Sequence, residues 1–140
     1  MAETRELQRA RRCLADAEND LESAEGLARL TEGLELLDDL IGVGAAEAAI
    51  ARNLAATYAG RVYTRVRAAV ERDGQIPEPR LEQYFKTVLA FDRVATALPA
   101  AASELKIAVV RQLIDRYYEG HPAAAKRRAF DELAKLSRRG

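Results

Sequence analysis

The sequence predicts an all-α fold, an antiparallel bundle of five to six helices in one domain. Alanine, the residue with the highest helix propensity, supplies 28 of the 140 residues. Apolar residues recur at spacings of three and four along nearly the whole chain, and no alternating strand pattern interrupts them. Only 12 residues are glycine or proline. A chain of this length is typical of a single domain.

The first two helices are expected over residues 4–18 and 20–41. Two apolar rows support them, and the second row is one residue out of phase with the first. The rows are Leu7, Ala10, Leu14, Ala17, Leu21 and Ala24, then Leu27, Leu30, Leu34, Leu37 and Ile41. One long helix could absorb this slip. A capping box formed by Asn19 and Glu22 favours a break instead, and Gly42-Val43-Gly44 ends the second helix.

A third helix is expected over residues 45–72, because apolar residues there stand four apart. They are Ile50, Leu54, Tyr58, Val62, Val66 and Val70. Asp73-Gly74 is expected to close this helix, with the glycine in the left-handed conformation. The prolines of segment 75–79 exclude helix there and predict a loop.

The remaining helices are expected over residues 79–97, 100–118 and 122–137. The first carries a row of alternating spacing, made of Leu81, Tyr84, Val88, Phe91, Ala95 and Leu98. Pro99 suits the start of the helix over 100–118. That helix has apolar residues on nearly all sides, which predicts a central position with Leu113 and Ile114 both buried.

Charge patterning argues against nucleic acid as a partner. The formal net charge is zero, so no overall field steers the protein toward an anion. Residues 14–40 carry about −8 and residues 126–139 carry +4. Arg61 and Arg65 stand one turn apart and are possible anion contacts. We expect instead that basic helices lie beside the acidic one, within or between subunits.

The cysteine content and the hydropathy pattern exclude further classes of protein and of site. A single cysteine, Cys13, excludes an internal disulfide and a cysteine-based zinc site. Arg11 and Arg12 could lower its thiol pKa, although a small buried apolar role is favoured. No apolar run approaches the roughly 20 residues that cross a bilayer, and no secretory leader is visible. We expect a cytoplasmic protein without a membrane partner. Its 18 arginines against 4 lysines favour a bacterial source.

Metal and cofactor sites are not expected. One histidine excludes a ferritin-like site, which needs two Glu-x-x-His pairs. Carboxylates on the outer face of the second helix are better explained as a solvated acidic surface than as metal ligands. They are Glu32, Glu35, Asp38 and Asp39. Gly42-Val43-Gly44 lacks the lysine and the hydroxyl residue of a phosphate-binding loop.

The segment from Arg116 to His121 separates an arginine and a histidine by four residues. This pattern resembles the motif of HEPN-type helical ribonucleases, small helical bundles that often dimerise. In that family the pair stands near the end of the penultimate helix, as it does here. The resemblance implies that His121 would shuttle the 2′-hydroxyl proton and that Arg116 would hold the scissile phosphate. Here Tyr117 replaces the small polar residue that many members carry after the arginine.

A structural role for these two residues is the favoured interpretation. Gly120 and Pro122 predict that His121 lies beyond the helix end, at the start of the next helix. Arg116 is then expected near the carbonyl end of its helix, where its charge meets a favourable dipole.

The preferred functional prediction is a non-enzymatic helical interaction or adaptor protein that associates with itself as a homodimer or higher oligomer. Another protein is the alternative partner. Leucines on and beside the 27–41 row widen its apolar face beyond what one neighbouring helix covers. The expected interface residues are Leu27, Leu30, Leu36 and Leu40. The HEPN-like ribonuclease is the first alternative. The second is a small-ligand-binding helical domain, in which Tyr58, Tyr63 and Tyr84 would line an internal pocket.

Overall fold

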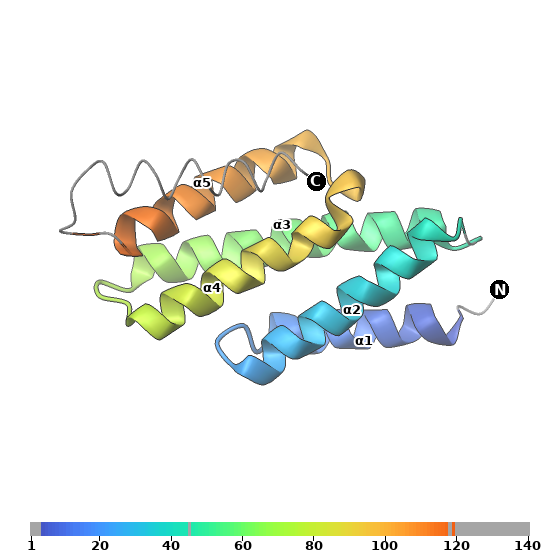
Figure 1. Ribbon diagram of the computed structural model, residues 1–140, viewed down its shortest axis with the longest axis horizontal. Coiled ribbons are helices and arrows are strands. Elements are labelled where there is room, and N and C mark those ends of the chain that lie inside the picture. The colour runs from blue at the N-terminus through green and yellow to red at the C-terminus, as the bar shows by residue number, and fades with distance from the viewer. Residues whose placement is uncertain (1–3, 45, 118, 120–140) are drawn as a thin grey trace.

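A computed structural model describes residues 4–44, 46–117 and 119, and these residues contain five α-helices, one 3₁₀ segment and no strand (Figure 1). The elements are α1 (Arg5–Glu18), α2 (Ala24–Gly42), α3 (Ala48–Arg72), α4 (Glu78–Ala90), η1 (Phe91–Ala97) and α5 (Ala100–Tyr117). The predicted all-α bundle is confirmed. The helix expected over residues 122–137 lies outside the described residues.

Successive helices alternate in direction, so α1, α3 and α5 run one way and α2 and α4 run the other (Figure 1). Helix α3 packs against α1, α2, α4, η1 and α5, whereas α5 packs mainly against α3 and α4. The prediction that the helix over 100–118 is central is therefore wrong, and α3 takes that place. Polar residues interleaved among the apolar ones, such as Glu104, Arg111 and Asp115, keep one side of α5 exposed.

The break between the first two helices is confirmed, but different residues cap it. Asn19 is the C-cap of α1, and its side-chain amide donates to the carbonyl of Ala15. Ser23 is the N-cap of α2, and its hydroxyl accepts from the Gly26 amide at 3.0 Å. The predicted capping box of Asn19 and Glu22 is wrong. The turn folds back so tightly that a Cβ at Gly26 would overlap the Asp20 carbonyl.

Helices α1 and α2 approach closely around Gly33. A Cβ built at this glycine would lie 3.0 Å from Cγ of Leu14 and 3.2 Å from Cβ of Cys13. Leu7, Leu14 and Leu30 are completely buried in the shared core. The glycine therefore provides the space in which the Leu14 side chain packs.

The inner face of α3 differs from the predicted row in its first half. Ala51, Ala55 and Ala59 are completely buried, whereas Ile50 is 41% exposed. Leu54 and Tyr58 are half-buried at the flank. From Val62 onward the predicted valines do face the core. Alanine side chains allow α3 to lie closer to its neighbours than larger side chains would. The face that the neighbouring helices cover therefore decides which residues of this half are buried, and the more hydrophobic Ile50 stays exposed.

The connections follow the predicted loops, with one difference in backbone conformation. Gly44 has a φ of 64°, and within the described ranges no other residue has a positive φ. Gly74 therefore does not adopt the predicted left-handed conformation. The C-cap of α3 is Asp73, with extended backbone angles. Pro79 lies in the first turn of α4, where proline is tolerated.

The helix expected over residues 79–97 is not continuous, because α4 changes into the 3₁₀ segment η1 at Phe91. Val94 departs from helical angles, with φ −115° and ψ 25°. Phe91 is buried as predicted. The tighter 3₁₀ winding then buries Val94, three residues later, whereas the predicted Ala95 is only half-buried. The buried ammonium group of Lys106 forms an ion pair with Asp92 and fixes η1 against α5.

Replacing Leu113 with alanine should lower the free energy of unfolding by about 2–5 kcal/mol. Both Leu113 and Ile114 are buried as predicted, and the truncation leaves a cavity between α5 and its neighbours. Urea unfolding measures the change. The matched control is Ile107→Ala on the same helix, where the side chain is 44% exposed and the expected change is within about 0.5 kcal/mol. Equal losses in the two variants would contradict this packing.

Candidate functional site

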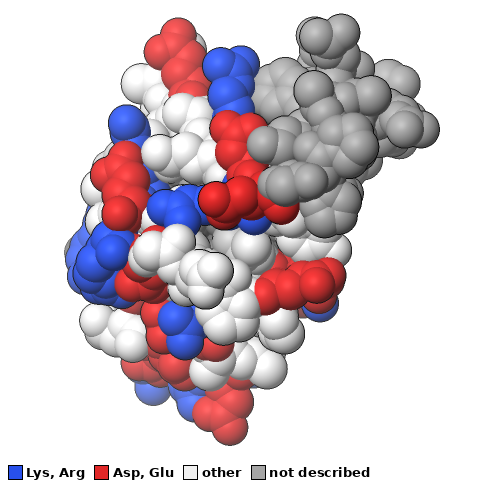
Figure 2. All heavy atoms as spheres, turned by 90° about the vertical axis from the view of Figure 1, so that its left-hand side faces the viewer, with Lys and Arg blue, Asp and Glu red and all other residues white. Residues whose placement is uncertain are grey.

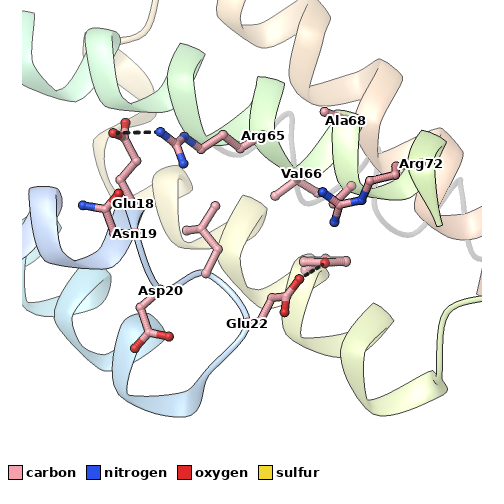
Figure 3. Close-up of a pocket in the computed structure, with 11 residues that line it drawn as sticks. Glu18, Asn19, Asp20, Glu22, Arg65, Val66, Ala68 and Arg72 are labelled. Atoms are coloured by element: carbon pink, nitrogen blue, oxygen red, sulfur yellow. Dashed lines mark hydrogen bonds and ion pairs between the residues drawn. The ribbon is translucent and has the colours of Figure 1, made fainter.

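A cleft of about 370 Å³ lies where the connection between α1 and α2 meets the second half of α3 (Figure 3). Its walls carry charged groups from both elements, with apolar side chains between them. The lining residues are Glu18, Asn19, Asp20, Leu21, Glu22, Arg65, Val66, Ala68, Ala69, Arg72 and Tyr84. Of the candidate site residues singled out in the sequence, only Arg65 and Tyr84 line this cleft.

A buried carboxylate at the end of α1 holds the arginines of α3. Glu18 is only 6% exposed, and its Oε1 accepts from Arg61 Nη2 at 2.5 Å and from Arg65 Nη2 at 3.5 Å. Charge partners of this kind offset the desolvation of a buried carboxylate. The guanidinium of Arg61 also lies 5.2 Å from the centroid of the Tyr58 ring. The expectation that basic helices lie beside the acidic segment holds for Arg61 and Arg65 of α3. The basic residues of segment 126–139 lie outside the described residues.

The acidic wall of the cleft is held in place by α4. The Tyr84 hydroxyl donates to Glu22 Oε1 at 3.1 Å, and the Gln83 side chain donates to the Ser23 carbonyl at 2.9 Å. Ser23 also donates to Asp20 Oδ2 at 2.6 Å. Burial, followed by the hydrogen bond to Glu22, raises the pKa of Tyr84 to about 12. The phenol therefore remains a hydrogen-bond donor across the neutral range.

The other wall carries Arg72 at the end of α3. Its Nε donates to Asp73 Oδ1 at 3.1 Å, and 71% of its side chain is exposed. In Figure 3 the guanidinium extends from α3 toward the connection that carries Glu22. Figure 2 shows acidic and basic side chains interspersed at this end of the molecule, without a region of one sign. The cleft therefore presents both charges.

The three tyrosines proposed for a ligand pocket do not meet in one cavity. Tyr63 is completely buried and packs edge-to-face on Phe91, with ring centroids 5.4 Å apart. Its hydroxyl finds no hydrogen-bond partner within the described structure, and burial raises its pKa. Tyr58 lies at the flank of α3 beside Arg61. Tyr84 alone reaches the cleft.

Arg116 caps the end of α3. Its Nη1 donates to the Gly74 carbonyl at 2.5 Å and its Nη2 to the Val70 carbonyl at 3.0 Å. The predicted position near a helix carbonyl end is confirmed, since Arg116 lies in the last turn of α5. These bonds occupy donors that a phosphate clamp would use. His121 lies outside the described residues.

Cys13 has the small buried role that the sequence favoured. Its thiol donates to Glu32 Oε2 at 3.5 Å. Burial raises its pKa, and Glu32 raises it further, so the thiol is not activated. Glu32 also forms an ion pair with Arg9, and Glu35 Oε1 lies 3.6 Å from Arg93 Nη1. The described residues contain no group of three or more side chains that could hold a metal ion.

The leucines expected at an interface are partly used within the chain itself. Leu30 is completely buried and Leu40 is 9% exposed, both in the core of the bundle. Leu27 and Leu36 are half-buried on α2. Leu30 and Leu40 therefore offer no contact surface in this conformation.

Comparisons of this chain with protein-family models, curated proteins and solved structures found no match. Among the described helices, none combines the length and the apolar character that a bilayer crossing requires.

Stability should fall as the pH rises from 10 toward 12, because Tyr84 keeps its proton when folded and loses it when unfolded. The unfolded chain then binds fewer protons, so each such tyrosine removes up to about 1.4 kcal/mol per pH unit. Urea unfolding across this range measures the slope. Tyr84→Phe should flatten it, because the substitution removes the phenol that keeps its proton in the folded state. An unchanged slope in Tyr84→Phe would contradict the assignment.

Proposed function

We propose that this protein is a non-enzymatic helical interaction protein that associates with a second copy of itself through the outer face of α3. The observation that carries the proposal is a glycine, Gly60, in the interior of this 25-residue helix. A groove of about 550 Å³ runs beside it between α3 and α5. The groove is lined by Thr57, Gly60, Arg61, Thr64, Arg65 and Leu105.

The fold of a single chain does not account for Gly60. A Cβ added there meets no atom within 4 Å, so this chain has room for a side chain. Glycine inside a helix costs about 1 kcal/mol relative to alanine. Close approach of a second backbone is a physical reason for a glycine at this position.

The surface around Gly60 suits another helix. Thr57 and Thr64 flank it at one turn on either side, and the Thr64 hydroxyl donates to the Gly60 carbonyl at 2.7 Å. That bond satisfies the hydroxyl within α3. Leu105 borders the groove on the α5 side, and Ile50 exposes 41% of its surface on α3. These residues replace the leucines of α2 as the proposed interface.

A second copy is the occupant that the charge of the chain favours. The formal net charge is zero, so two copies do not repel each other at long range. Pairing through a two-fold axis would place the same face of both copies in contact.

We also propose that the protein belongs to a bacterial cytoplasm. The arginine-rich composition and the free buried thiol of Cys13 support this location.

Light scattering at micromolar concentration should report a mass about twice 15.4 kDa. Gly60→Arg should shift the protein to the monomer, because the new side chain fills the space for the partner helix. The matched control is Ala28→Arg, an exposed alanine on α2, which should leave the dimer intact. A wild-type mass of one chain at all concentrations would overturn the proposal.

A mixed RNA substrate should remain uncleaved by the wild type and by His121→Ala. The reason is that the Arg116 guanidinium already donates hydrogen bonds to the carbonyls of Gly74 and Val70. Gel analysis of the products measures cleavage. Activity that disappears with the His121 substitution would replace the present proposal with the HEPN-like ribonuclease alternative.

A further inference from the structure

We draw no further inference here: the strongest candidate, the cleft between the second half of α3 and the connection from α1 to α2, offers only the exposed side chains of Arg72 and Glu22, which Asp73 and Tyr84 already hold, and nothing in the described residues points to a ligand there.

Discussion

Helix α3 sets the arrangement of the described helices through close packing on its buried face. Each of the other described elements contacts it. Small side chains, Ala51, Ala55 and Ala59, line its first half, and larger ones line its second half, where Tyr63 packs on Phe91. The small side chains of the first half allow neighbouring helices to approach closely. The larger side chains of the second half fill the space where α4, η1 and α5 gather around α3.

Buried and capping charges then fix the elements that surround α3. Glu18 connects the end of α1 to Arg61, and Lys106 connects α5 to Asp92 of η1. Arg116 holds the end of α5 against the last carbonyls of α3. Removing one partner from such a buried pair costs more than the pair itself contributes, because the remaining charge is left desolvated. Loss of Asp92 would therefore leave the Lys106 ammonium buried without its charge partner.

Two surface depressions lie along the same helix. The groove with Gly60 opens toward α5, and the cleft with Arg72 opens toward the connection between α1 and α2. Arg65 lines both, and its Nη2 lies 3.5 Å from Glu18 Oε1. Self-association is proposed only for the groove with Gly60.

The all-α class, the proline loop and the burial of Leu113 and Ile114 could be predicted from the sequence alone. Each depends on local periodicity or on the backbone limits of proline. The sequence left open whether residues 4–41 form one helix or two, and the capping box that favoured a break does not form. The sequence did not predict that Ala51 faces the core in place of Ile50, that Ser23 caps α2 or that η1 winds as a 3₁₀ segment. The tertiary structure also brought Glu22 and Arg72 to one cleft. Local apolar patterns predict which residues can be buried. Which face of a helix is covered depends on the neighbouring helices, because the packing distance is set by side chains that are far apart in the chain.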